Sequence, residues 1–143
     1  MKTLSMLLFL NIVLFAANID NFAQKMGYER DYYTAILKAK QAHKPLIMVL
    51  GADYCPWCRK FENKTLKSRI IKFKVDKEFI VLIVDKKYDI KTFPKKYRTQ
   101  FTPRVFFINP KNERILFDSV GYIKKKKFEQ LLNRAIETSK DSL

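Results

Sequence analysis

Two cysteines separated by two residues, Cys55-Pro56-Trp57-Cys58, constrain the fold of this chain more than any other feature. They are the only cysteines in 143 residues, and they stand between an apolar run, residues 45–51, and a helical pattern, residues 59–66. A short uninterrupted apolar run is typical of a buried strand, and proline is well tolerated at the first position of a helix. The sequence therefore predicts a strand that leads directly into a helix.

Cys55 is expected at the start of that helix, and this position has chemical consequences. The free N–H groups and the positive end of a helix stabilise an anion, so the Cys55 thiol should ionise easily. Cys58 follows three residues later on the same helical face, so the two sulfurs can form a disulfide. Cys55 would then be the exposed nucleophile, and Cys58 the resolving thiol that breaks a mixed disulfide by attacking it.

Two structural interpretations of the cysteines stay open beside this redox interpretation. A disulfide across so short a loop gains little from loop closure, so it would contribute little stability as a structural link. A structural zinc site takes about four ligands, and only His43 and a few carboxylates are available to join the cysteines. We expect no metal and no cofactor other than the redox-active disulfide. His43, the only histidine, is expected on the surface.

The first 17 residues have the pattern of a secretory signal peptide. Lys2 is followed by an almost wholly apolar run over residues 4–17, which ends in small residues. This run is shorter than the roughly 20 residues that span a bilayer, so an uncleaved anchor is the less favoured alternative. We expect cleavage near Ala16 or Ala17, export to the periplasm or beyond, and a leader segment over residues 18–31 that is loose as far as residue 27.

The chain is strongly basic, with 29 Lys and Arg against 14 Asp and Glu and a formal net charge of +15. Such a balance raises nucleic acid, anionic lipid and acidic proteins as partners, but export argues against nucleic acid. The lysines are dispersed, as on a solvated surface. The densest run, residues 124–127, is expected on a solvated helix face, with a weak contact to an anionic membrane as the alternative.

Hydrophobic periodicity predicts the elements around the cysteine motif. A helix before Pro45 should turn Tyr33, Ile36 and Leu37 towards a sheet. Ser68 is the expected N-cap of a helix over residues 69–76. We expect that helix to turn three apolar residues inward, Ile70, Ile71 and Phe73.

Residues 79–85 are nearly all apolar, as in a parallel strand covered on both faces, and with the strand at residues 46–50 they predict a βαβ unit. Residues 104–108 and 113–117 flank an Asn-Pro turn and predict an antiparallel hairpin. A final amphipathic helix is expected over residues 125–138. Its apolar stripe consists of Phe128, Leu131, Leu132 and Ala135.

The order of these elements resembles a thioredoxin over about residues 32–136. Three local segments carry the resemblance: residues 51–60 around the cysteines, Thr102-Pro103 before an apolar strand, and residues 120–122 before the last helix. The most similar subgroup is the exported thioredoxin-like proteins of bacteria. The implied fold is an α/β thioredoxin fold, a central mixed β-sheet flanked by helices, in a domain over residues 32–140.

The resemblance implies roles for the Thr102-Pro103 segment. Pro103 should form a cis peptide bond and lie against the disulfide, while the backbone of Thr102 pairs with an extended segment of the substrate. Trp57, between the cysteines, is a further candidate substrate contact, and packing on the protein's own surface is its alternative. Tyr54 and Tyr122 are weaker candidates for the rim of the same surface.

The sequence departs from thioredoxin at the residues that move protons and set the potential. The dipeptide between the cysteines is Pro-Trp instead of Gly-Pro, so the direction of electron flow does not transfer. In thioredoxins a buried Asp accepts a proton from the resolving thiol, and a lysine in the next strand is its partner. Here Val49 stands at the position of the Asp, and Val81 stands at the position of the lysine. Water, Asp53 or Glu62 is the candidate replacement.

The leading hypothesis is an exported, monomeric thiol–disulfide oxidoreductase that reduces protein disulfides. It requires a redox partner that donates or accepts electrons, with a membrane-bound reductase among the candidates. A disulfide oxidase or isomerase is the first alternative, and a high reduction potential would mark it. The second alternative is a non-catalytic binding module whose basic surface contacts acidic lipids or proteins.

Overall fold

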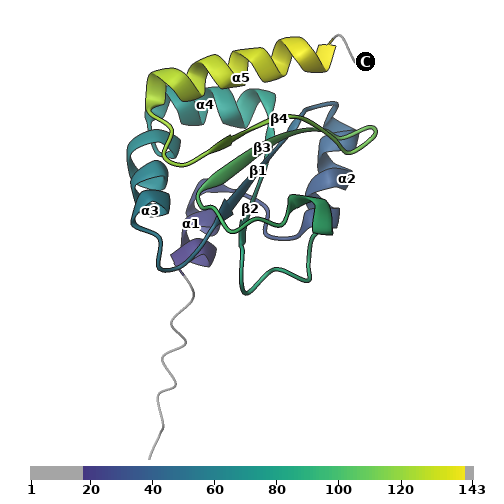
Figure 1. Cartoon of the computed structure of the whole chain (residues 1–143). Helices are drawn as coiled ribbons and strands as arrows, with labels where there is room; N and C mark the ends of the chain where they lie inside the picture. Colours follow the sequence, from purple (N-terminus) through teal and green to yellow (C-terminus); the bar gives the residue numbers. More distant parts are fainter. Residues whose placement is uncertain (1–17, 141–143) are drawn as a thin grey trace, which may run out of the picture.

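A computed structural model describes residues 18–140 as a four-stranded mixed sheet with helices on both faces (Figure 1). The strand order is β2-β1-β3-β4. The strands are β1 (Leu46–Gly51), β2 (Ile80–Asp85), β3 (Arg104–Asn109) and β4 (Arg114–Val120). β2 runs parallel to β1, whereas β3 is antiparallel to both β1 and β4. The expected βαβ unit, the hairpin and the mixed α/β sheet are therefore confirmed.

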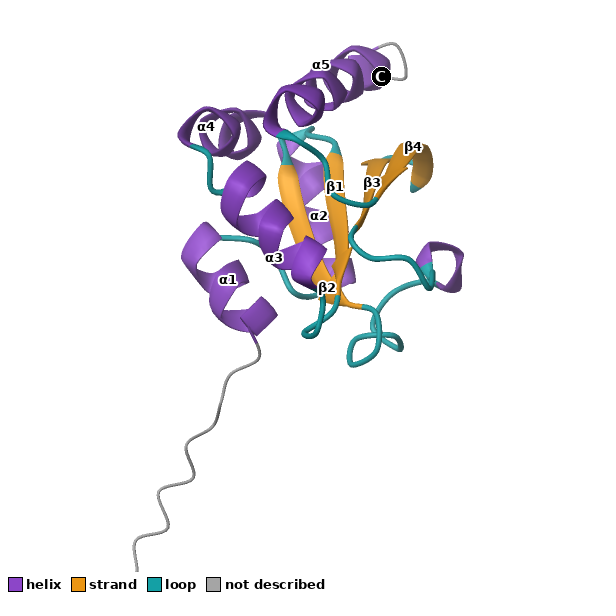
Figure 2. Cartoon of the chain, turned by 60° about the vertical axis from the view of Figure 1, so that its left-hand side comes forward, coloured by secondary structure: helices purple, strands orange, loops and turns teal. Residues whose placement is uncertain are grey.

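Two helical layers cover the sheet (Figure 2). The strands β1, β2 and β3 are accordingly buried on both faces, whereas the edge strand β4 is only partly buried. One layer contains α1 (Asn18–Met26), α3 (Pro56–Phe61), the π-helix η1 (Glu62–Leu66), α4 (Arg69–Glu78) and α5 (Lys125–Lys140). The other contains α2 (Tyr32–Ala42) and the 3-10 helix η2 (Lys95–Tyr97). Ile47 and Val49 of β1 join the core of the first layer, and Met48 and Leu50 join that of the second, because successive side chains alternate between the faces of a strand.

The expectation of a loose leader over residues 18–27 is wrong. This segment forms α1, and four of its side chains are buried in the larger core: Ile19, Phe22, Ala23 and Met26. These positions follow the i, i+3, i+4, i+7 spacing of one helix face. The segment after α1 then pairs with the outer edge of β2, where the N–H of Glu29 donates to Val81 O at 2.8 Å and Glu29 O accepts from the N–H of Ile83 at 3.0 Å.

Arg30 ties this N-terminal segment to two other parts of the fold. Its guanidinium pairs with Asp20 of α1 at 2.7 Å and with Asp89 of the loop after β2 at 2.9 Å. It also donates to the backbone oxygen of Ile83 in β2. A single side chain thus links α1, β2 and the following loop.

Two further expectations about helix faces are confirmed only for Ile71 and Ile36, and are wrong for the other residues named. In α4, Ile71 and Val75 are buried, whereas Ile70 and Phe73 are exposed. In α2, the buried face consists of Tyr32, Ala35, Ile36 and Ala39, and the side chains of Tyr33 and Leu37 are exposed. The stripe expected on α5 is buried as predicted.

The signal peptide expected over residues 1–17 lies outside the described residues and stays a prediction. Within residues 18–140, none of the helices has both the length and the apolar character needed to cross a membrane.

Candidate active site around Cys55 and Cys58

Cys55 and Cys58 form a disulfide where β1 gives way to α3. Their Cα atoms are 5.1 Å apart. Cys55 is the N-cap of α3, with extended backbone angles, and Pro56 occupies the first turn. The Cys55 Sγ accepts a hydrogen bond from the backbone N–H of Cys58 at 3.1 Å. The motif therefore has the strand–helix placement that the sequence predicts.

The two sulfurs differ in their surroundings. Cys58 is 2% exposed and faces the core, where its Sγ lies 3.9 Å from the point at which a Cβ on Gly51 would stand. Cys55 is 8% exposed and lies nearer the surface. A substrate therefore has better access to Cys55, as expected of the attacking thiol.

The Thr102-Pro103 segment, directly before β3, reaches the disulfide through the side chain of Thr102. The peptide bond between the two residues is cis, which confirms the expectation. The hydroxyl of Thr102 lies 3.5 Å from the Cys55 Sγ and can donate to it. The carbonyl of Pro103 accepts from the N–H of Gly121 at 2.8 Å, so the segment after β4 holds this loop in place.

Trp57, the residue between the cysteines, packs against a second aromatic ring. Trp57 is 56% exposed and stacks on Tyr122, with ring centroids 6.1 Å apart. The Lys60 ammonium lies 4.9 Å from both ring centroids and holds the pair by cation–π contacts. One face of Trp57 thus packs on the protein, and more than half of the residue's surface stays available to a partner.

Two other aromatic residues are exposed in the segments that carry the site. Tyr54, directly before Cys55, is almost fully exposed, and so is most of Phe101, directly before Thr102. Tyr54 was a weak candidate from the sequence. Phe101 was missed, although its position next to the Thr-Pro pair was a usable signal.

The proton relay of thioredoxin is absent at its usual positions. Val49 and Val81 are both buried in the larger apolar core. The candidate replacement Glu62 is instead buried one helical turn after Cys58, and its backbone N–H points to the carbonyls of Cys58 and Arg59. Glu62 is therefore a buried carboxyl at the start of η1, which follows α3 and Cys58 directly.

Opposing influences act on the Glu62 carboxyl. Burial raises its pKa to about 7, and the nearby charge of Asp53 adds to the rise. The Arg59 guanidinium, at 2.9 Å from the carboxylate, and the Lys67 ammonium act in the lowering direction. A group with this pKa can both accept and release a proton near neutral pH.

Asp53, the other candidate carboxylate, is held by the loop before Cys55. Its backbone N–H donates to the buried carboxylate of Asp85 at 3.1 Å. The Oδ1 atom of Asp53 and the Nε of Arg59 are buried with no hydrogen-bond partner among the described residues. Asp53 of the loop thus lies near enough to Arg59 and Glu62 for the three charged side chains to act on one another.

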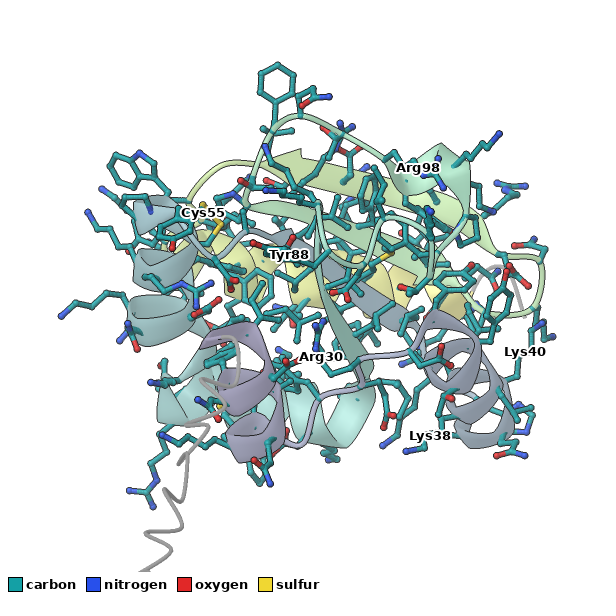
Figure 3. All side chains as sticks on the ribbon, turned by 90° about the horizontal axis from the view of Figure 1, so that it is seen from below. Arg30, Lys38, Lys40, Cys55, Tyr88 and Arg98 are labelled. Atoms are coloured by element: carbon teal, nitrogen blue, oxygen red, sulfur yellow. A yellow bond between two sulfur atoms is a disulfide. The ribbon has the colours of Figure 1, made fainter. Side chains whose placement is uncertain are left out.

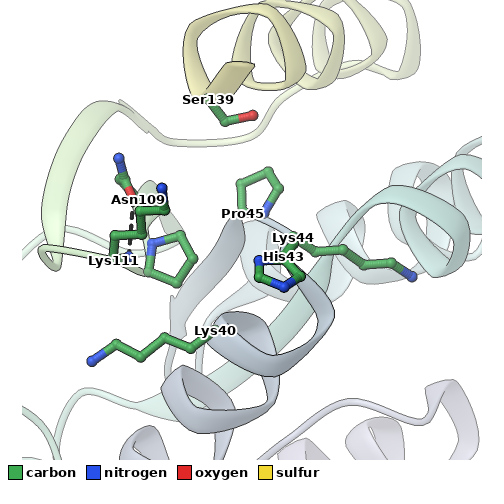
Figure 4. Close-up of a pocket in the computed structure, with 8 residues that line it drawn as sticks. Lys40, His43, Lys44, Pro45, Asn109, Lys111 and Ser139 are labelled. Carbon is green, nitrogen blue, oxygen red and sulfur yellow. Dashed lines mark hydrogen bonds between the residues drawn. The ribbon is translucent and has the colours of Figure 1, made fainter. Parts of the chain in front are cut away.

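His43 lies far from this site, as expected. It is the C-cap of α2 and lines a small pocket of about 110 Å³ with Pro45, which precedes β1, whereas Cys55 follows β1 (Figure 4). His43 therefore cannot join the cysteines as a metal ligand. In the described part of the chain, His, Cys, Asp and Glu side chains form no group of three that would hold a metal ion.

Comparison with known proteins agrees with this arrangement. A family model described as a thioredoxin-like domain matches residues 32–136. A protein of Borreliella burgdorferi described as uncharacterized is 31% identical over 97 residues, which are 67% of this chain and 41% of that protein. The present chain therefore spans less than half the length of this relative.

Solved structures share the fold at lower identity. A thioredoxin from Thermus thermophilus superposes with a TM-score of 0.66 at 18% identity, over 75% of this chain and 85% of that chain. The C-terminal domain of DsbD from Neisseria meningitidis, in its reduced form, superposes with a TM-score of 0.61 at 23% identity, over 72% and 92% of the two chains. With the family match over residues 32–136, the sheet topology and the paired cysteines beside a cis proline, the chain belongs to the thioredoxin-like family.

Proposed function

We propose that this protein is an exported thiol–disulfide oxidoreductase that reduces protein disulfides. The observation that carries the proposal is the environment of the Cys55 sulfur. The N–H of Cys58 and the hydroxyl of Thr102 both reach it, at 3.1 and 3.5 Å, and hydrogen bonds to a thiolate lower the cost of forming it. The same two donors would stabilise Cys55 as the attacking and as the leaving group.

The reaction has two exchange steps. In the first, the Cys55 thiolate attacks one sulfur of the target disulfide, the target S–S bond breaks, and the leaving thiolate takes up a proton. In the second, Cys58 loses its proton and attacks Cys55, which releases the other target thiol. The target gains two electrons and two protons, and the Cys55–Cys58 pair is oxidised to its disulfide.

Glu62 is the proposed acceptor of the Cys58 proton. It is buried one turn from Cys58, and its pKa of about 7 matches the task near neutral pH. Water in the pocket of about 260 Å³ that Glu62 and Arg59 line with α1 would carry the proton onward to solvent.

Thr102, Pro103 and Trp57 are the proposed contacts to the substrate. The backbone of Thr102 pairs with an extended segment next to the target disulfide, as in strand addition to a sheet. Pro103 shapes the loop that presents Thr102, and the exposed part of Trp57 covers the apolar side chains of the bound segment.

The reductive direction requires a partner that returns two electrons to the Cys55–Cys58 disulfide, and a dithiol reductase in the membrane is the proposed class. The signal peptide pattern over residues 1–17 supports export. The DsbD C-terminal domain, a structural neighbour, has been solved in reduced and oxidised forms, which supports a pair that cycles.

The reduction potential of the pair tests the direction. It is measured by equilibration with glutathione buffers and trapping of free thiols. A value near −270 mV, about that of thioredoxin, supports a reductase, whereas about −120 to −180 mV would indicate an oxidase or isomerase. A pair that does not cycle would overturn the redox function and favour a binding module.

The roles of the two cysteines are tested by trapping. The Cys58→Ser variant should accumulate a mixed disulfide with a protein substrate, because the resolving step is removed. The Cys55→Ser variant, which leaves only the buried sulfur, should accumulate at least tenfold less. Equal trapping by both variants would contradict the assignment of Cys55 as nucleophile.

A further inference from the structure

A groove beside the candidate active site has a charge pattern that the exchange chemistry does not use. It is enclosed by the end of β1, the loop after β2 and the loop before Thr102, and its volume is about 580 Å³. This lies within the range of ligand-binding pockets, roughly 300–1,000 Å³. Leu50, Ile90 and Phe93 form an apolar part of its wall.

Three cationic side chains, those of Lys86, Lys87 and Arg98, line the same groove, and no acidic residue does. Within residues 18–140, none of the three forms an ion pair. Lys87 and Arg98 are exposed. An excess of positive charge therefore stands at the mouth of a partly apolar groove.

The acidic residues nearest in sequence to Lys86 and Lys87 make other contacts. Asp85 is buried, and its carboxylate accepts from the backbone N–H groups of Asp53, Lys87 and Tyr88. The carboxylate of Asp89 pairs with Arg30 at 2.9 Å and accepts from the N–H of Asp85. Neither carboxylate neutralises the cations of the groove.

The residues of the groove adjoin the two segments that carry the candidate site. The backbone N–H of Lys86 donates to Gly51 O at 2.9 Å, at the start of the loop that carries Cys55. The Lys86 ammonium donates to Gln100 O at 2.8 Å, and Gln100 stands two residues before Thr102. Seen from below, Tyr88 lies between Cys55 and Arg98 on this side of the molecule (Figure 3).

We propose that this groove is a subsite for an acidic segment of the protein substrate. The proposal rests on the proposed function, because the segment is the one that carries the target disulfide. The apolar wall takes an aliphatic or aromatic side chain, and Lys87 and Arg98 pair with carboxylates beside it. Thr99 and Gln100 of the groove stand three and two residues before Thr102, and an extended segment advances about 3.3 Å per residue. The proposal therefore places the carboxylates a few residues from the target cysteine, in the segment that pairs with Thr102.

The test compares two disulfide-linked peptides with the same leucine near the cysteine. One carries two glutamates at the flanking positions, and the other carries two glutamines. The reduced protein is mixed with each peptide, and the second-order rate constant of disulfide reduction is measured at low and at high salt. The variants are Lys87→Glu and Arg98→Glu, and Lys140→Glu is the matched control, since it makes the same change in net charge at the far end of α5.

We expect the wild type and the Lys140→Glu variant to reduce the acidic peptide about fivefold faster than the neutral one. The preference should shrink at about 0.3 M salt, because exposed charges are screened. It should be abolished or inverted by Arg98→Glu. Equal rates for both peptides, with efficient reduction of each, would overturn the subsite and leave the proposed function standing.

A binding measurement separates the subsite from the redox function. Peptides with serine in place of cysteine are titrated against the oxidised protein and followed by fluorescence anisotropy. Acidic peptides that bind more tightly than neutral ones, with the preference lost in Arg98→Glu, support the subsite even if no peptide is reduced. Glutathione disulfide is titrated in the same way, as a small acidic disulfide. If Arg98→Glu weakens its binding as much as that of the acidic peptide, the groove would bind a small acidic disulfide, and the proposal of a protein segment would be overturned.

Discussion

At Glu62, burial and an ion pair act in opposite directions on one carboxyl group, and burial prevails. The raised pKa, about 7 against an ordinary value of 4.5, means that the folded chain holds a proton at pH values where the unfolded chain has lost it. Stability that is present below about pH 4.5 should therefore decrease as the pH rises, until it levels off above about pH 7.

We predict that Glu62→Gln removes this pH dependence. The variant should match the wild type near pH 4 and exceed its free energy of unfolding by up to about 3 kcal/mol at pH 8. Urea unfolding across that pH range measures the effect, and the exposed Glu137→Gln change is the control. If Glu62 accepts the Cys58 proton, the Glu62→Gln variant should also resolve its mixed disulfide with a substrate more slowly than the wild type does, although the variant is the more stable protein.

Tyr32 is a second residue whose environment predicts a measurable loss of stability on substitution. Its buried hydroxyl donates to the Glu113 carboxylate at 2.9 Å and lies 3.2 Å from the Tyr97 hydroxyl. Burial, with these hydrogen bonds, raises the pKa of Tyr32 far above its ordinary range. Tyr32→Phe leaves both partners short of a hydrogen bond and should cost about 1–2 kcal/mol of unfolding free energy. The neighbouring Tyr33→Phe change, at an exposed ring, should cost almost nothing; equal losses would contradict this account.

At the scale of the elements, α1 is the part of the fold whose role differs most from expectation. Its buried face packs against the core that supports the active-site helix, and Phe22 lies edge-on to Tyr28 with ring centroids 5.9 Å apart. Phe22→Ala should therefore cost about 3 kcal/mol in urea unfolding. Gln24→Ala, on the exposed face of the same helix, should leave stability within about 0.5 kcal/mol. A similar small effect for both variants would show that α1 contributes little.

The elements also show which features of the fold the hydrophobic pattern of the sequence determines and which it leaves open. The strands and α5 were predictable because their apolar pattern fits only one placement. In α4, residues 70 and 73 form one possible apolar stripe and residues 71 and 75 another, and packing against α5 and the sheet selects the second. In α2, the buried face includes Ala35 and Ala39, which carry a weak hydrophobic signal but allow the helix to lie close to the sheet.

The candidate site was predictable to the extent that it is local in sequence. The cysteines, Trp57 and the Thr102-Pro103 pair are all visible in short motifs. The Arg59–Glu62 ion pair is also local, because the two residues stand three positions apart along the helical segment. The burial of Glu62 and the cationic groove were not predictable, because they depend on how distant parts of the chain meet.

At the scale of the whole molecule, that edge is the carboxyl end of the parallel pair β1 and β2, where α/β proteins commonly place their sites. The N-terminal segment is part of the support of this edge, although the family match begins only at residue 32. A chain that starts at residue 32 loses four buried side chains of α1 and the links made by Arg30.

We predict that this shortened chain melts at least about 10 °C below a chain that starts at residue 18, since each buried apolar side chain contributes about 2 kcal/mol and 1 kcal/mol shifts the midpoint by a few degrees. Thermal unfolding followed by circular dichroism measures the difference. Coincident melting curves would show that residues 32–140 fold independently of α1.

The place of Trp57 has a practical consequence. It is the only tryptophan of the chain, and it stands between the two cysteines with more than half of its surface open to solvent. A disulfide quenches indole emission at short range, whereas two thiols quench it less. The fluorescence of the unlabelled protein should therefore rise when the pair is reduced, so the protein carries its own optical indicator of electron transfer.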